Sequence, residues 1–192
     1  MSDVLVDKSK TALVVIDLQK GIVGRPTVPY ASETVVKNAA ALAAAFRKHG
    51  MPVFLVRVTP SPDRKDALRP IADAAMPAQT PPPDWAEIVP EMGPKQGDFV
   101  ITKRQWGAFY GTDLDLQLRR RGMAAIVLCG IATEFGVEST ARDAYERGYQ
   151  QVFAGDAMTG LNLDSHANAV ERIFPRMGRV RGTEEIIAAL SR

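Results

Sequence analysis

The segment 126–144 constrains the fold of this chain more than any other. It begins with an apolar run that ends at Cys129, passes through Gly130 and a turn of small residues, and continues from Thr133 as a helical pattern. A buried strand followed at once by a helix is the building unit of parallel α/β proteins, whose sheets present catalytic groups at this corner. The segment therefore predicts an α/β fold with a functional site near residues 130–136.

The same alternation continues along the chain. Short apolar runs predict buried strands, and segments with apolar residues on one face predict helices. Strands are predicted at 11–17, 52–58, 98–103, 124–129, 151–154 and 178–181, and helices at 32–49, 112–122, 133–148, 164–174 and 183–190, the last with Thr183 as N-cap. This order predicts a parallel sheet covered by helices on both faces. Without a linker, an internal repeat or a low-complexity tract, we expect one domain over 1–192.

One connection is much longer than the others. Residues 59–97 are rich in proline, including Pro81 to Pro83, and carry no clear periodic pattern. We expect at most a short helix at 84–89. A connection of this length is either functional or an excursion from the compact fold.

Composition excludes several classes of protein. The 192 residues are 46% hydrophobic and 24% charged, with a net charge of +2 and no long basic block, which argues against nucleic-acid binding. The one cysteine cannot form an internal disulfide. The chain shows neither a signal-peptide pattern nor an apolar run near the roughly 20 residues of a membrane helix. We expect a cytoplasmic protein that does not bind membranes.

Two charged residues stand at the ends of predicted strands. Asp17 ends the first run, and Lys103 ends the third. Open α/β sheets bind ligands at the carboxyl ends of their strands, and a carboxylate is costly to bury there without a partner. The ordinary alternatives are that Asp17 binds a neighbouring loop and that Lys103 faces solvent.

Three motifs occur in order around these residues. They are Val14 to Gln19, then Lys103 followed by Gly107-Ala-Phe109 and Thr112-Asp-Leu114, and then Gly130 to Thr133. Together they resemble the isochorismatase-like superfamily of cysteine hydrolases over nearly the whole chain. The resemblance implies a three-layer α/β/α, Rossmann-like fold with a six-stranded parallel sheet in the order 3-2-1-4-5-6.

The resemblance also implies roles for particular residues. Asp17 matches the acid–base aspartate of the family, and Lys103 matches its site lysine. The Ile131–Ala132 bond matches a position where the family carries a non-proline cis peptide. Backbone N–H groups at such a turn would form an oxyanion hole.

The sequence departs from the family at Gly136, which stands where most members carry the nucleophilic cysteine. A glycine cannot form an acyl-enzyme. Cys129 lies within a predicted strand, where a buried, inert thiol is expected, and Thr133 is better explained as a helix N-cap than as a nucleophile. Gly136 either relieves crowding against a strand or opens volume for a ligand, and we favour the second interpretation.

Four further residues are candidates for substrate contacts: Glu134, Phe135, Trp106 and Phe109. Glu134 either interacts with the helix dipole or forms a carboxylate pair with Asp17. Trp106 and Phe109, with the nearby Tyr110, either form an apolar wall for a planar substrate or anchor a second subunit.

Neither a metal nor another cofactor is expected. The nicotinamidase branch of the superfamily places an aspartate and two histidines after the second strand, whereas residues 59–65 contain no histidine. The only histidines are His49 and His166, too few for such a site. The resemblance further implies a small-molecule substrate and assembly into a homo-dimer or homo-tetramer.

Three functions remain open from the sequence. The first is hydrolysis without a covalent cysteine intermediate, as in the isochorismatase branch, where Asp17 would protonate a vinyl ether and Lys103 would hold a substrate carboxylate. The second is a catalytically inactive relative that binds a small molecule. The third is an amidase that uses water directly, with Glu134 or Asp17 as base.

Overall fold

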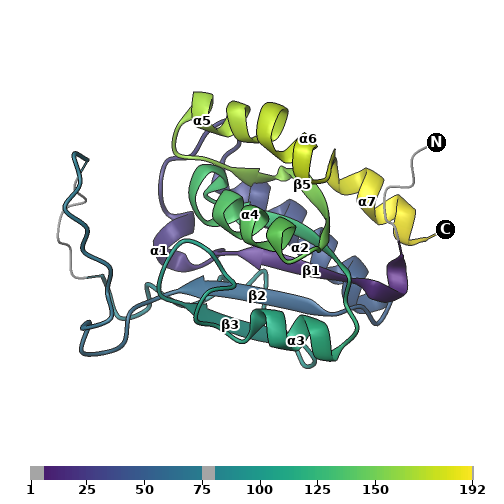
Figure 1. The fold of residues 1–192 in the computed structure, drawn as a ribbon, viewed down its shortest axis with the longest axis horizontal. Helices are drawn as coiled ribbons and strands as arrows, with labels where there is room; N and C mark the ends of the chain where they lie inside the picture. The colour runs from purple at the N-terminus through teal and green to yellow at the C-terminus, as the bar shows by residue number, and fades with distance from the viewer. Residues whose placement is uncertain (1–6, 75–80, 192) are drawn as a thin grey trace.

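The computed structural model describes residues 7–74 and 81–191 and contains a six-stranded sheet (Figure 1). The strands are β1 (Thr11–Ile16), β2 (Val53–Val58), β3 (Phe99–Lys103), β4 (Ala125–Ile131), β5 (Gln150–Thr159) and β6 (Arg179–Arg181). Every pairing is parallel, and the order is β3-β2-β1-β4-β5-β6. The predicted α/β fold and strand order are confirmed.

The helices are more broken than the sequence predicts. They are α1 (Lys20–Val23), α2 (Ser32–Lys48), α3 (Leu114–Arg120), α4 (Glu138–Glu146), α5 (Leu163–Asn168), α6 (Phe174–Met177) and α7 (Thr183–Leu190), with a 3-10 turn at Lys8–Lys10 and π-helical turns at Thr133–Val137 and Ala169–Ile173. The π-helical turns divide the two predicted helices at 133–148 and 164–174. Thr183 is the first residue of α7 rather than its N-cap, and its hydroxyl donates to Asp156.

The prediction of a short helix at 84–89 is wrong. This segment pairs with the chain after β1 instead. The carbonyls of Trp85 and Glu87 accept hydrogen bonds from the N–H groups of Gly21 and Lys20, and Ile88 forms an antiparallel bridge with Gln19. Carbonyls engaged in this way are not used for the hydrogen bonds of a local helix.

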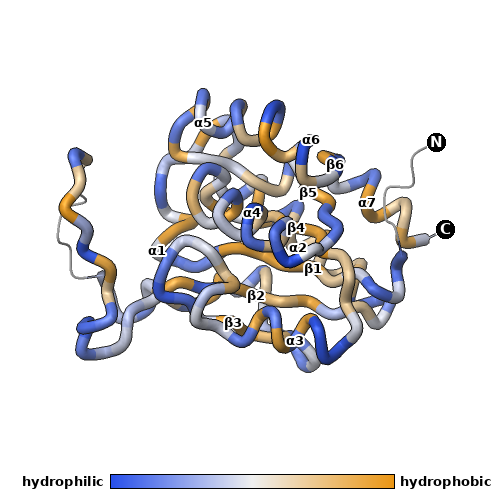
Figure 2. Tube along the Cα trace, viewed as in Figure 1, coloured by the Kyte–Doolittle hydropathy of each residue, from blue (hydrophilic) through white to orange (hydrophobic). Residues whose placement is uncertain are grey.

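Each face of the sheet has its own hydrophobic core, because alternate residues of a strand point to opposite faces. One core joins α2 and α7 to strand residues such as Leu13, Leu55 and Val127. The other joins α3, α4 and α6 to the alternate strand residues, including Val14 and Ile126. Figure 2 shows hydrophobic residues concentrated along the central strands. This packing fixes the carboxyl ends of the strands relative to one another.

The predicted long connection divides into two parts. Its return, 81–97, packs against the body through the buried residues Val89 and Met92. Its outgoing part, residues 59–74, projects away from the body at the left of Figure 1 and is called the arm.

Among the helices of the described residues, none has both the length and the apolar character that crossing a membrane requires.

Candidate functional site

Asp17 and Lys103 meet at the carboxyl end of the sheet although their strands are not neighbours. Asp17 follows β1, Lys103 ends β3, and β2 lies between them. The Nζ of Lys103 lies 2.9 Å from Oδ2 of Asp17, and the exposed fractions of the two side chains are 0% and 8%. Lys103 also donates to the backbone carbonyl of Trp106. The two predicted charges therefore form a buried ion pair.

The environment of Asp17 raises the pKa of its carboxyl group above the ordinary value. Burial raises the pKa of Asp17 from 3.8 to about 6, and the neighbouring ammonium of Lys103 opposes this shift. The second carboxylate oxygen, Oδ1, is buried without a hydrogen-bond partner. The backbone of Asp17 also has a φ of 52°, a left-handed conformation that is uncommon outside glycine and often found at functional sites. Asp17 is thus suited to donate a proton near neutral pH.

The raised pKa of Asp17 predicts a pH dependence of stability. Because the pKa of Asp17 in the folded state, about 6, lies above its ordinary value of 3.8, the folded state binds this proton more tightly than the unfolded state. The free energy of unfolding should therefore fall as pH rises from about 4 through about 6. Chemical denaturation across this range measures the change, and an Asp17→Asn variant should lack this component. Equal slopes for the two proteins would contradict the expectation.

Gly136 lies directly against the ion pair. A Cβ atom at this position would stand 2.8 Å from Cγ2 of Ile16, 3.0 Å from Nζ of Lys103 and 3.1 Å from Oδ2 of Asp17. Contacts this short require neighbouring atoms to move, and the methyl group of Ile16 belongs to the core. The geometry therefore supports the crowding interpretation of Gly136 over the open volume that we favoured from the sequence.

The corner after β4 contacts a side chain of α5, a helix more distant in the sequence. The Ile131–Ala132 peptide bond is cis. Thr133 is not the N-cap that its sequence position suggests: its hydroxyl lies 2.8 Å from Nδ1 of His166 in α5, and both residues are buried. Burial lowers the pKa of His166, an effect that Glu134 and Glu171 oppose. His166 is therefore a structural partner of the corner. The sequence did not show this, because a single histidine within a helical pattern gives no sign of its contacts.

Glu134 binds the loop before α5, whereas the carboxylate-pair interpretation requires it to face Asp17. Its Oε1 accepts hydrogen bonds from the backbone N–H groups of Leu161 and Asn162, at 2.8 and 3.1 Å. Gly160 permits this approach, since a Cβ there would lie 2.5 Å from Oε2 of Glu134. The charged partner of Asp17 in the described residues is Lys103, and Glu134 fastens the loop before α5 to the corner.

The predicted aromatic contacts separate into two environments. The rings of Trp106 and Phe135 pack at a centroid distance of 4.9 Å, and Trp106 is 62% exposed. Phe109 instead lies in the core beneath α3 and α4, where it stacks on Tyr149. Trp106 therefore contacts the ion pair through its backbone carbonyl, whereas the ring of Phe109 is unavailable to a substrate in this structure.

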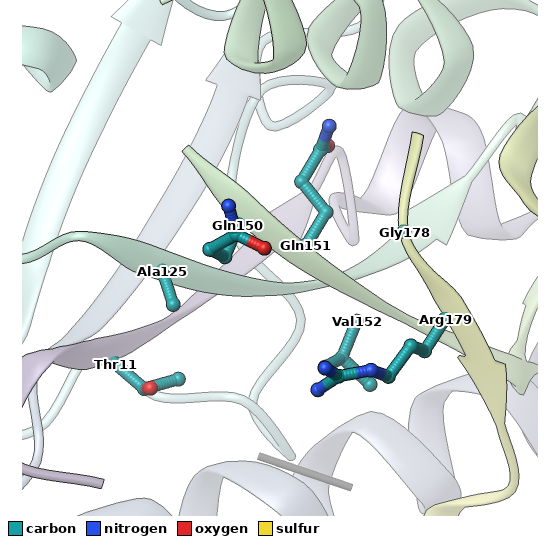
Figure 3. Close-up of a pocket in the computed structure, with 7 residues that line it drawn as sticks. All are labelled: Thr11, Ala125, Gln150, Gln151, Val152, Gly178 and Arg179. Carbon is teal, nitrogen blue, oxygen red and sulfur yellow. The ribbon is translucent and has the colours of Figure 1, made fainter. Parts of the chain in front are cut away.

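Two other features lie apart from the ion pair. Cys129 is fully buried, and burial raises the pKa of its thiol to about 12, so that the thiolate is scarce near neutral pH. A cavity of about 40 Å³, shown in Figure 3, lies at the amino ends of the strands, beside Thr11, Ala125, Gln150 and Arg179. Across the described ranges, no three His, Cys, Asp or Glu side chains cluster in a way that could hold a metal ion.

The parallel sheet and the buried acid–amine pair define the class of this protein: an α/β protein with a candidate site at the carboxyl edge of its sheet. A family model described as the isochorismatase domain matches residues 11–185. The chain belongs to the isochorismatase family. This membership supports a hydrolase-like enzyme.

Relatives resemble the chain over nearly its full length. An uncharacterised isochorismatase family protein of Bacillus subtilis, YwoC, is 53% identical and covers 97% of both chains. A solved isochorismatase family structure from Burkholderia thailandensis is 46% identical with a TM-score of 0.92, covering 96% of this chain and 97% of that one. A probable isochorismatase of Pseudomonas chlororaphis is 28% identical over 95% of this chain and 87% of its own length.

Proposed function

We propose that this chain hydrolyses a small, carboxylate-bearing substrate without a covalent cysteine intermediate, by vinyl-ether cleavage with Asp17 as the acid. The observation that carries the proposal is the buried Asp17–Lys103 pair, in which the carboxylic acid has a pKa near 6 beside a residue without a side chain. Gly136 stands at the nucleophile position of the cysteine hydrolases in this proposal. In the absence of a thiol, Asp17 and Lys103 then perform the reaction together.

The proposed reaction conserves protons. Asp17 donates its proton to the terminal enol carbon, which leaves an oxocarbenium ion. Water adds to this ion and returns a proton to the Asp17 carboxylate. The hemiketal then collapses to a ketone and an alcohol. Lys103, whose ammonium has three donors of which Asp17 and Trp106 engage two, directs the third toward the substrate carboxylate.

Access to the acid requires a local rearrangement. The side chain of Asp17 is only 8% exposed. The ring of Trp106 packs against that of Phe135, and the backbone carbonyl of Trp106 accepts a hydrogen bond from Lys103. In the proposed function, movement of the Trp106 ring admits the substrate, and the backbone N–H groups around Ile131 and Ala132 donate to the substrate oxygen that departs as the alcohol when the hemiketal collapses.

The direct test is turnover of isochorismate, followed as pyruvate release, with simple amides as alternative substrates. Asp17→Asn is expected to lower kcat/KM by at least about 100-fold, because general acid catalysis contributes roughly 10²–10⁴-fold. The matched control is Asp143→Asn, which neutralises a carboxylate on α4 that pairs with Arg147. Release of pyruvate that survives Asp17→Asn, or no turnover of any vinyl ether, would count against the proposal.

The second candidate is a catalytically inactive, small-molecule-binding relative of the cysteine hydrolases. The nearly closed Asp17–Lys103 pair and the buried, weakly acidic thiol of Cys129 favour it. A small carboxylate that raises the melting temperature without being converted would support binding alone, because a ligand specific for the folded state stabilises it. The direct-water amidase is less favoured, since Glu134 is engaged by the loop before α5.

We further propose that the protein acts in the cytoplasm on a small molecule and assembles into a homo-dimer or homo-tetramer. The net charge of +2 supports a small-molecule substrate over binding to nucleic acid. Assembly into an oligomer would require a contact surface between the chains.

A further inference from the structure

The alternation of side chains along β1 breaks at the acid of the candidate site. Val15 packs in the core that contains α2 and α7, and Ile16 packs in the core that contains α3 and α4. Continued alternation would place Asp17 on the face of Val15 and Leu18 on the face of Ile16. In the structure, however, Leu18 is buried in the same core as Val15. The chain therefore changes direction between Ile16 and Leu18.

The backbone of Asp17 makes this change of direction. Its φ of 52° is left-handed, and its carbonyl accepts a hydrogen bond from the N–H of Gln19 at 2.8 Å. The turn brings the carboxylate to the face of Ile16: Cγ2 of Ile16 and Oδ2 of Asp17 lie 2.8 and 3.1 Å from the Cβ position of Gly136. Lys103 lies on this face, 2.9 Å from Oδ2. The ion pair therefore depends on the turn, because an extended strand would direct the carboxylate to the opposite face.

A left-handed backbone at an aspartate needs support from its surroundings. The side chain of Gln19, which is fully buried, lies two residues after the acid. Its Nε2 donates to the carbonyls of Val58 and Trp85 at 3.0 and 3.2 Å, and its Oε1 accepts from the N–H of Val58 at 2.8 Å. These partners are 39 and 66 positions away in the chain. The amide therefore joins the turn to two distant segments.

Those segments enclose the turn from two sides. Val58 is the last residue of β2, which pairs with β1, and Trp85 belongs to the return segment 81–97. The backbone of the return segment also contacts the turn, since the N–H of Val89 donates to the carbonyl of Leu18 at 3.0 Å. The side chain of Gln19 bonds to both neighbours at once. Its loss would release the turn from the end of β2 and weaken its attachment to the return segment.

We propose that Gln19 is a positioning residue of the candidate site, whose buried amide fixes the turn that directs the Asp17 carboxylate toward Lys103. The inference rests on the proposed function, in which Asp17 is the acid. Gln19 acts through Asp17 and not on the substrate, because backbone carbonyls engage both of its N–H donors. Without these bonds, the turn relaxes toward an extended backbone and the carboxylate moves away from the ammonium into water.

The first experiment measures the pKa of Asp17 by carbon NMR of its carboxyl group, with Asp17→Asn identifying the signal. Gln19→Met keeps the length of the side chain but removes all three hydrogen bonds. The pKa should then move at least halfway from about 6 toward 3.8, because burial, the larger influence on it, is relieved. An unchanged pKa in the folded variant would overturn the proposal.

Gln151→Met is the matched control. Gln151 is 3% exposed, and its Nε2 donates to the carbonyl of Ala141 at 3.0 Å. It lies at the amino end of β5, on the opposite edge of the sheet from the ion pair. This variant should also lose stability, but the pKa of Asp17 should keep its wild-type value. Equal changes of the pKa in the two variants would indicate general loosening and would contradict a positioning role for Gln19.

The second experiment compares kcat with KM in the vinyl-ether assay. Misplacement of a reacting group is costly, so Gln19→Met should lower kcat by about 10–100-fold and change KM by less than about threefold, since Lys103 still binds the substrate carboxylate. Gln151→Met should keep the wild-type kcat. A raised KM with unchanged kcat would overturn the proposal. A lowered pKa without turnover of any vinyl ether would support the positioning role and count against the proposed function, because the NMR measurement needs no substrate.

The test does not depend on a single variant. Circular dichroism establishes folding, and Gln19→Glu replaces Gln19→Met if the latter is unfolded, because it keeps the acceptor for Val58 and loses both donors. In the wild-type protein, the Nε2 protons of Gln19 should exchange with deuterium at least about tenfold more slowly than those of the exposed Gln150. Equally fast exchange would show that the amide is not held, and the proposal would be wrong.

Discussion

Replacing Lys103 with methionine is expected to destabilise the protein by about 3–5 kcal/mol near pH 7.5, because it leaves the Asp17 carboxylate buried without a counter-charge. The ion pair is 2.9 Å long and almost inaccessible to water. Water therefore cannot compensate the remaining charge. Urea denaturation of the wild type and of Lys103→Met measures the difference in unfolding free energy.

Two experiments distinguish the effect of the unpaired Asp17 charge from the effect of lost packing. Adding Asp17→Asn to Lys103→Met removes the remaining charge and should restore most of the lost stability. Lowering the pH to about 4 should also narrow the gap, because Asp17 is then protonated. Arg142→Met, which breaks the exposed Arg142–Glu138 pair, is the matched control and should cost less than about 1 kcal/mol. Equal losses for Lys103→Met and Arg142→Met would contradict a buried ion pair.

Gly136→Ala is expected to destabilise the protein, although alanine normally favours a helix by up to about 1 kcal/mol over glycine. A Cβ at this position would stand 2.8 Å from Cγ2 of Ile16. Overpacking of this kind costs about 1–3 kcal/mol, which exceeds the gain in helix propensity. The sign of the measured change therefore decides between a crowded corner and open volume, and a stabilised variant would establish the open volume.

Gly136→Cys extends the same argument to chemistry. The thiol should enter the site only at a cost in stability, and the single variant should gain little thiol-dependent amidase activity. Ile16→Leu removes the β-branched methyl group that lies closest, so the double variant Ile16→Leu/Gly136→Cys should recover stability relative to Gly136→Cys. No recovery would show that Ile16 is not the obstruction, and efficient amide hydrolysis by the single variant would show that the corner already admits a thiol.

The fold was accessible from the sequence for a physical reason. A strand buried on both faces must be apolar along its length, so runs such as those at 11–17 and 124–129 are visible without any knowledge of their partners. The order of the strands came with the family resemblance rather than from the runs themselves. The segment 84–89 was missed because its hydrogen bonds are made to residues 19–21, more than sixty positions away in the chain.

The site was accessible only in part. Asp17 and Lys103 stand at strand ends, and parallel strands bring such ends to one edge. The partners of Thr133, Glu134 and Phe109 were not visible, because each is fixed by a helix or loop distant in sequence. The sequence pattern predicted that Thr133 caps a helix. In the structure, its buried hydroxyl contacts His166 instead.

The sequence by itself determined the parallel sheet, the helices on both of its faces and the presence of an acid and an amine at its carboxyl edge. Those properties depend on periodicity and on the position of residues along each strand, which are local. Only the tertiary structure decided that the acid and the amine form one closed pair, that Ile16 occupies the space beside Gly136, and that the arm stands clear of the body. These depend on distances between segments far apart in the chain, which the packing of the whole protein sets.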